Sequence, residues 1–302
     1  MKRKPIYVET NIRTDMESLW KYTQKPHLHE RWDLRFSKIE YLEKEHEDAP
    51  QHFTYETRIG FGLGIKGTGV SRGERFADSG ERTSSLGFFS GQRLSLIKEG
   101  SGYWKYRNLG DGDITFLTQY DYKTRWGAVG QVIDRFTFRP LIGWATSWSF
   151  DTLRLLLEKG ITPEDSLKRS FIHMFVCFAL SFVWLYQGLV PKLLFPHTGE
   201  VAMVVESGLF SGMEEGVVRL IGFVQCVLGM LFLLPIEKKW LFAGSSAAVF
   251  FLGLGPLFVQ PEVFLLPFNP ASLNVPVIVL GVIGAVNCKH LPLARRCRRK
   301  RK

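Results

Sequence analysis

Four long apolar runs occupy the second half of the chain. Each run approaches the length of about 20 residues with which an α-helix crosses a hydrocarbon core roughly 30 Å thick. The stretches 220–236, 240–261 and 263–288 contain no Asp, Glu, Lys or Arg. A helix on the surface of a soluble domain needs a polar face, so this pattern predicts an all-α bundle of four membrane-spanning helices. The predicted spans are about 170–190, 217–234, 240–259 and 273–288.

The first half of the chain follows a different pattern, in which apolar and polar residues alternate. Residues 6–13 alternate in this way and predict a strand with one buried face. Thr14 and Glu17 have the spacing of a helical capping box, and a short helix is expected after them. Residues 36–126 predict successive strands separated by Gly, Asp and Pro turns.

The spacing of apolar residues becomes helical from residue 127 to residue 159. One helix face is predicted to carry Val129, Val132, Ile133 and Phe136. Pro140 is expected to break or kink this helix, and Asp151 and Arg154 argue against a transmembrane position for its second part.

A strand, two small helices, a run of antiparallel strands and a long final helix resemble the SRPBCC superfamily, also called START-like or polyketide-cyclase-like. The resemblance rests on Asp15-Met16-Glu17-Ser18-Leu19-Trp20 after the first strand, on His29-Glu30-Arg31-Trp32-Asp33 and on the closing helix. It implies an α+β helix-grip domain over residues 1–160, in which an antiparallel sheet surrounds a long C-terminal helix. Such domains bind lipids, sterols or aromatic products in a cavity.

Aromatic residues on the inner faces of the predicted elements are candidates for the lining of that cavity. The alternative for each of them is that it simply fills a core. The candidates are Trp20, Phe53, Tyr55, Phe61, Phe116, Tyr120, Tyr122 and Phe136.

The membrane half resembles the DoxX-like family, over about 170–290. The resemblance rests on Trp-Leu-Tyr-Gln-Gly-Leu-Val-Pro-Lys-Leu at 184–193, on the four spans and on Asn-Val-Pro at 274–276. Relatives in that family include subunits of quinone-linked oxidoreductases, so the resemblance makes a redox role one candidate function. Ionisable residues beside apolar helix are functional candidates, and here these are Lys192 and Arg219.

Basic residues are concentrated at the C-terminal end. Residues 295–302 carry seven of the ten excess positive charges, so the rest of the chain carries only +3, and nucleic-acid binding is not expected. Four spans and a basic tail (291–302) predict a multi-pass plasma-membrane protein with both termini in the cytoplasm. The tail is expected to attract anionic lipid, and residues 161–169 are expected to be a polar linker.

Chemical motifs are sparse along the chain. Gly62-Leu63-Gly64-Ile65-Lys66-Gly67 matches a dinucleotide fingerprint, but strand-like sequence follows where a helix is required. His27 and His29 have no further ligand cluster, so no metal is expected. No catalytic motif is found, no catalytic residue is assigned, and whether the chain is an enzyme is left open.

Three functions therefore remain. The first is a membrane protein whose cytosolic domain binds an apolar ligand such as a lipid or an isoprenoid, with no cofactor. The second is a subunit of a membrane oxidoreductase, for which quinone is the expected cofactor. The third is an assembly module. Membrane lipids, a small apolar molecule and other membrane proteins are the expected partners.

Overall fold

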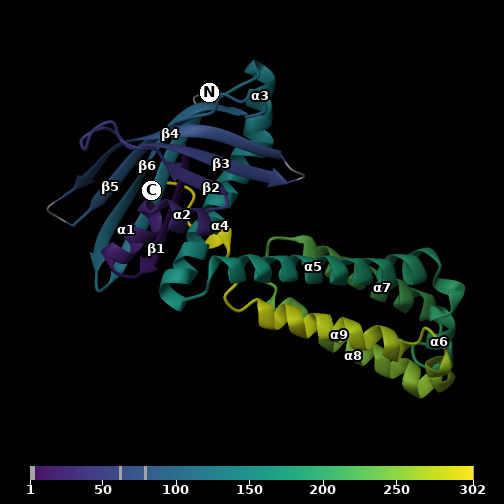
Figure 1. Ribbon diagram of the computed structural model, residues 1–302. Helices are drawn as coiled ribbons and strands as arrows, with labels where there is room; N and C mark the ends of the chain where they lie inside the picture. The colour runs from purple at the N-terminus through teal and green to yellow at the C-terminus, as the bar shows by residue number, and fades with distance from the viewer. Residues whose placement is uncertain (1–3, 61–62, 78–79, 302) are drawn as a thin grey trace. The chain divides into compact units, whose positions relative to one another are not determined.

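The structure is a computed structural model that describes residues 4–60, 63–77 and 80–301. The chain divides into two compact units (Figure 1). The first unit contains the chain up to Ser166 together with the chain from Pro292 onward, and the second is Leu167–Leu291.

The first unit is built on a seven-stranded antiparallel sheet in the order β1-β7-β6-β5-β4-β3-β2. Consecutive strands from β2 to β7 are neighbours, and β1 closes the series by pairing with β7, with Ile6 opposite Tyr120. The strands are β1 (Ile6–Arg13), β2 (Lys38–Tyr41), β3 (His52–Gly60), β4 (Leu63–Phe76), β5 (Arg82–Phe89), β6 (Ile97–Gly110) and β7 (Asp113–Thr124).

Helix α4 (Arg139–Lys159) packs against this sheet and closes the fold. Phe150 on α4 stacks on Phe116 of β7 with ring centroids 4.4 Å apart, and both side chains are fully buried. The shorter helices α1 (Met16–Gln24) and α2 (Pro26–Trp32) follow β1, and Trp32 joins the same core. The α+β helix-grip architecture expected from the sequence is therefore confirmed.

Two local details differ from the sequence expectation. Helix α1 is capped by Asp15, whose Oδ1 accepts a 2.7 Å hydrogen bond from the Ser18 backbone N–H, and not by Thr14. An Asp side chain at this position satisfies an N–H that the helix cannot. The helix before Pro140 changes its winding: α3 (Gly127–Ile133) is followed by a π-helical turn (Asp134–Phe138), and α4 begins next to the proline.

The C-terminal tail is part of the first unit. Arg298 and Glu9 of β1 exchange two backbone hydrogen bonds of 2.8 and 2.9 Å, and the Arg298 guanidinium lies 2.9 Å from the Glu9 carboxylate. The buried Cys297 thiol donates to the Ser147 carbonyl on α4 at 3.2 Å, and the Leu293 N–H donates to Asp151 at 2.7 Å. The tail therefore covers the free edge of β1 instead of forming the separate segment that the sequence suggested.

Among the described residues, four helices are long and apolar enough to cross a membrane, and all but the first four residues of the first helix belong to the second unit. They are Pro163–Leu194, Glu214–Leu233, Lys239–Val259 and Pro270–Asn287. The first comprises α5 (Pro163–Gly188) and a π-helical turn (Leu189–Leu194), and the others are α7, α8 and α9. The short helix α6 (Glu200–Glu206) lies between α5 and α7 in the chain.

Helix α5 begins inside the segment expected to be a linker. The Thr162 hydroxyl accepts from the Asp165 N–H at 3.1 Å and donates to the Asp165 carboxylate at 2.9 Å. This capping interaction, with Pro163 in the first turn, starts the helix early. Only residues 160–162 separate α4 from α5, and Gly160 ends α4 in the left-handed conformation, with φ of 66°.

Close contacts at glycine hold the transmembrane helices together. A Cβ on Gly188 would lie 2.4 Å from the Gly222 carbonyl oxygen, so α5 and α7 meet backbone to backbone. Trp184 on α5 donates to the Ser245 hydroxyl on α8 at 2.8 Å. Small residues and interhelical hydrogen bonds of this kind are typical of packing in bilayers, where apolar burial alone does not favour helix association.

The docked tail can be tested by reversing one charge. Arg298→Glu places two carboxylates side by side and is expected to release the tail, whereas Arg301→Glu makes the same charge change at an exposed position. Burial raises the pKa of the Cys297 thiol to about 12, so this thiol should react with N-ethylmaleimide roughly tenfold faster in Arg298→Glu, because only the exposed thiolate reacts.

The readout is mass-spectrometric mapping of the labelled cysteines in the full chain. Glu9→Arg combined with Arg298→Glu should restore protection, because the ion pair is then re-formed in reverse. Equal labelling rates in the wild type and all variants would contradict the docked arrangement.

Candidate functional site

A cavity of about 360 Å³ lies between the inner face of the sheet and α4. Its size is within the range of about 300–1,000 Å³ that small-molecule sites occupy. Residues of β2 to β7 form most of the wall, Ile142 of α4 closes one side, and the α1–α2 region supplies Thr23, Gln24 and His29. Most of the surface inside the cavity is apolar, and polar side chains, Lys44 and Glu74 among them, are interspersed with the aromatic and aliphatic ones.

Glycines on the strands leave room for this cavity. Phe53 of β3 lies across Gly69 of β4, so that a Cβ on the glycine would be 2.2 Å from the Phe53 ring. Tyr55 lies across Gly67 in the same way, with the corresponding distance 2.3 Å. Because the rings lie flat on the neighbouring strand, they form a smooth wall. A side chain at either glycine would lift the ring into the cavity.

A buried charged cluster forms one part of the wall. Asp33 is 1% exposed, and its Oδ2 lies 3.0 Å from His29 Nε2 and 2.6 Å from Arg35 Nη2. Arg35 Nε donates to the other carboxylate oxygen at 2.9 Å, which makes the pair bidentate. His29 and Arg35 both line the cavity, with Asp33 behind them.

The electrostatics of this cluster keep both members of the pair ionised. Burial would raise the pKa of Asp33, but the adjacent Arg35 and His29 outweigh it and hold that pKa well below its usual range. Burial would likewise lower the pKa of Arg35, and Asp33 raises it above its ordinary value instead. The cluster therefore presents donors to the cavity, while its positive charge is already neutralised by Asp33.

Tyrosines extend the polar part of the wall. Tyr120 lies with its ring 5.4 Å from the Arg35 guanidinium carbon, and its hydroxyl is 2.8 Å from the Thr146 hydroxyl on α4. Burial raises the pKa of Tyr120, and it raises the pKa of Tyr55 to about 12. Both phenols therefore stay protonated at neutral pH. The Tyr120 hydroxyl donates to Thr146, whose own hydroxyl donates to the Ile142 carbonyl, whereas the Tyr55 hydroxyl makes only a long 3.4 Å bond to the Phe89 carbonyl and can turn to a ligand oxygen.

The structure separates the aromatic candidates into groups. Phe53, Tyr55 and Tyr120 line the cavity. Trp20, Phe116 and Tyr122 pack in the hydrophobic core outside its lining. Phe136 is 71% exposed and does not reach the cavity, because α3 and the π-helical turn face away from the sheet interior. Phe61 lies outside the described residues.

Sequence reasoning assigned no site role to His29, Asp33 or Arg35. The available signal was the i, i+4 spacing of His29 and Asp33 on a short helix, followed two residues later by an arginine. The chain then continues toward a strand of mixed composition. Nothing in that spacing indicates burial, which arises from the sheet that covers the cluster.

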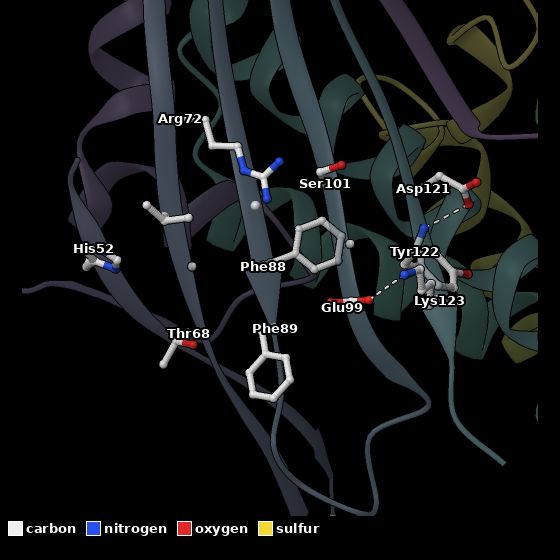
Figure 2. Close-up of a pocket in the computed structure, with 14 residues that line it drawn as sticks. His52, Thr68, Arg72, Phe88, Phe89, Glu99, Ser101, Asp121, Tyr122 and Lys123 are labelled. Atoms are coloured by element: carbon white, nitrogen blue, oxygen red, sulfur yellow. Dashed lines mark hydrogen bonds and ion pairs between the residues drawn. The ribbon is translucent and has the colours of Figure 1, made fainter.

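A second hollow, of about 530 Å³, lies on the outer face of the sheet (Figure 2). It includes residues of β4 to β7, among them Arg72, Ser101 and Lys123. The Lys123 ammonium lies 2.8 Å from the Glu99 carboxylate, and Asp121 is paired with Arg139 at 3.0 Å. These neutralised charges lie on an open surface, so the enclosed cavity is the better candidate for a ligand site.

The two candidates of the membrane half have local partners. Lys192 is 8% exposed in the π-helical turn after α5, and its Nζ lies 2.7 Å from the Glu200 carboxylate. Arg219 forms an exposed ion pair with Glu215, one turn earlier on α7. Within the described residues, no group of three or more His, Cys, Asp or Glu side chains is arranged to hold a metal ion.

The charge of Asp33 can be tested through the stability of the domain. Asp33→Asn leaves Arg35 buried without its counter-charge and is expected to lower the free energy of unfolding at pH 7 by about 3 kcal/mol. Because the folded pKa lies below the unfolded value of about 3.9, ionised Asp33 stabilises the fold above about pH 4. That contribution is lost as the pH falls through the folded pKa.

The difference between the wild type and Asp33→Asn should therefore be largest near neutral pH and shrink below about pH 4. Urea unfolding of the full chain in detergent, followed by tryptophan fluorescence, measures it. Asp113→Asn, at an exposed pair with Arg13, is the matched control and should change stability by less than about 0.5 kcal/mol. Similar losses in the two variants would contradict the role assigned to Asp33.

Comparison with solved structures finds START-like proteins that match the N-terminal half of the chain. A STAR-related lipid transfer protein from Xanthomonas axonopodis is 14% identical with a TM-score of 0.38, covering 51% of this chain and 85% of that chain. A START superfamily protein from Mycobacterium smegmatis is 10% identical with a TM-score of 0.37, covering 53% and 100%. Human StAR-related lipid transfer protein 5 is 13% identical with a TM-score of 0.39, covering 51% and 74%.

Comparison of sequences covers the remainder of the chain. The model of the DoxX-like family matches residues 181–282, within the membrane unit. The uncharacterized membrane protein YndG of Bacillus subtilis (strain 168) is 43% identical over 305 residues, and the match covers 100% of both chains. The chain therefore belongs to the same family of membrane proteins as Bacillus subtilis YndG.

Proposed function

We propose that the helix-grip domain binds a small apolar molecule that carries one neutral polar group, and that the membrane unit keeps this domain at the bilayer. The observation that carries the proposal is the aromatic cavity with the His29–Asp33–Arg35 cluster in its wall. An enclosed apolar space with a few convergent polar groups is the usual form of a small-molecule site.

The charge of the cavity wall limits the ligand class. The Arg35 guanidinium is paired with Asp33, so a ligand carboxylate or phosphate would compete with an existing bidentate partner. A ligand hydroxyl or carbonyl oxygen needs only one donor. The Tyr55 hydroxyl can supply it, because this phenol stays protonated and its present acceptor, the Phe89 carbonyl, lies at a long 3.4 Å. Lipids or isoprenoids that end in an alcohol, phenol or carbonyl group fit these conditions.

The site is proposed to face the cytoplasm from the plasma membrane. The N-terminal domain and the tail after the last span belong to one compact unit, which supports both termini being on one side of a four-span bundle. The tail is rich in Lys and Arg, and Lys238 and Lys239 stand together at the start of α8, whereas Lys192 is the single Lys or Arg in the sequence 191–216. This asymmetry favours a cytoplasmic domain.

Filling the cavity should remove the ligand. Leu86→Trp adds bulk on the inner face of β5, where Leu86 lines the cavity, while Ser85→Trp adds the same ring on the opposite face of the strand. The full chain, purified in detergent, is extracted with solvent, and the extract is analysed by mass spectrometry. We expect one reproducible apolar compound in the wild type and in Ser85→Trp, reduced about tenfold in Leu86→Trp because the space is occupied.

Lipids that bind the membrane unit should be present in all three samples, so the comparison distinguishes them from a compound bound in the cavity. The identity of the lost compound distinguishes a lipid or isoprenoid from a quinone. An extract that is the same for all three proteins would overturn the proposed function.

The orientation can be measured with fusion proteins. A green fluorescent protein joined after Lys302 is expected to fluoresce, and alkaline phosphatase at the same point should be inactive, because the first folds in the cytoplasm and the second requires export. Alkaline phosphatase inserted after Gly208, between α6 and α7, should be active. The opposite pattern of activities would place the cavity outside the cell.

A further inference from the structure

Helix α3 has its apolar residues on the exposed side and its small and polar residues on the side that packs against the protein. The side that faces the protein carries Gly130, where a Cβ would lie 1.8 Å from the Arg125 carbonyl oxygen. One turn later it carries Asp134, which accepts a 2.6 Å hydrogen bond from the Tyr122 hydroxyl. The side that faces away carries Val129 and Val132, which are 65% and 57% exposed. A helix on a domain surrounded by water has the reverse arrangement.

The exposed apolar residues continue into α4. After Val132, Ile133 and Phe136 come Leu141 and Trp144, all of them exposed. The interval of five residues from Phe136 to Leu141 spans the π-helical turn, which has about one extra residue compared with an α-helical turn. The turn therefore keeps Leu141 on the line of Phe136. We call the surface formed by Trp126, Val129, Val132, Ile133, Phe136, Leu141 and Trp144 the α3 stripe.

Positive charge lies beside the α3 stripe. The Arg135 guanidinium carbon is 5.5 Å from the centroid of the Phe136 ring. Arg299 of the tail donates to the Pro140 carbonyl at 3.3 Å and is exposed. Figure 1 shows α3 at the end of the sheet, where it stands clear of the strands. Exposed aliphatic and aromatic residues flanked by arginine are the composition of helices that lie in the interface of a bilayer.

We propose that the α3 stripe docks on the surface of an anionic lipid bilayer. The apolar and aromatic side chains enter the headgroup boundary, and Arg135 and Arg299 contact lipid phosphates. The four spans keep the domain at the membrane, since only residues 160–162 separate α4 from α5. Because this tether holds the α3 stripe near lipid at a high effective concentration, a short stripe with weak intrinsic affinity is enough for binding to the bilayer surface. The proposal does not depend on a ligand in the cavity.

The test uses the full chain in lipid nanodiscs of phosphatidylcholine and phosphatidylglycerol. Cys226 and Cys288 are replaced by Ser, while the buried Cys177 and Cys297 are kept. The fluorophore NBD is attached at Val132→Cys or, as a matched control, at Ser101→Cys on the outer face of the sheet. NBD at position 132 should emit at shorter wavelength and be quenched about twofold or more by phosphatidylcholine with a nitroxide on its acyl chain. NBD at position 101 should show neither effect.

A second variant tests whether the side chains of the α3 stripe, and not the NBD label, cause the contact with lipid. Val129→Ser combined with Phe136→Ser should reduce the quenching at position 132 by about half or more. The thermal stability of the domain should hardly change, because both side chains are exposed in the isolated unit. Equal, weak quenching at positions 132 and 101 would overturn the proposal. A wavelength shift without quenching by the nitroxide lipid would also overturn it, because a second copy of the chain or another protein would then cover the stripe.

Discussion

The helix-grip unit depends on the packing of α4 against the inner face of the sheet. The stack of Phe150 on Phe116 joins α4 to β7, and both rings are fully buried. Aromatic burial of this kind supplies much of the stability of a small core. Residues of α4 also contact the cavity, Tyr120 and the C-terminal tail. Ile142 closes the cavity, Thr146 holds the Tyr120 hydroxyl, and the tail packs along the flank of α4 at Ser147.

The candidate site carries two costs, and each of them lowers the stability of the fold. Space inside the sheet gives up packing contacts, and the burial of Asp33 gives up hydration. The structure limits the second cost with a bidentate arginine and a histidine on the same carboxylate. A core selected only for stability would more simply fill this volume with apolar side chains. A cavity whose polar groups are pre-arranged by a buried charge pair is instead consistent with recognition of a ligand.

The surface composition expected of the two units differs, because a unit that spans a membrane exposes apolar side chains to lipid, whereas a domain in water exposes polar ones. In the membrane unit an apolar surface is normal, and helices associate through small residues such as Gly188 and Gly222. In the helix-grip unit the same composition on α3 is unusual, because that unit has its own hydrophobic core. The inverted helix α3 and the docked basic tail are the two features on which the proposed contact with lipid rests.

Much of the architecture follows from local pattern. The apolar runs determine the spans, because hydrocarbon excludes charge and unsatisfied backbone over a fixed thickness. The alternation of apolar and polar residues and the two family resemblances are sufficient to predict the helix-grip domain and the DoxX-like domain. Phe53, Tyr55 and Tyr120 could be placed facing the interior because the period of a strand is two.

Tertiary structure alone decided the rest. The cluster of His29, Asp33 and Arg35 becomes a site only when the sheet buries it, and the local sequence does not encode that burial. Phe136 shares a helical period with Val129 and Val132, which predicted one buried face, yet the hydrogen bond from Tyr122 of β7 to Asp134 holds the opposite face of the helix inward and leaves this apolar face exposed. The sequence predicted a separate basic tail because the partners of this segment, Glu9 and Ser147, are more than a hundred residues away in the chain. Period and composition report only on neighbours in sequence, whereas burial and pairing depend on contacts between distant segments.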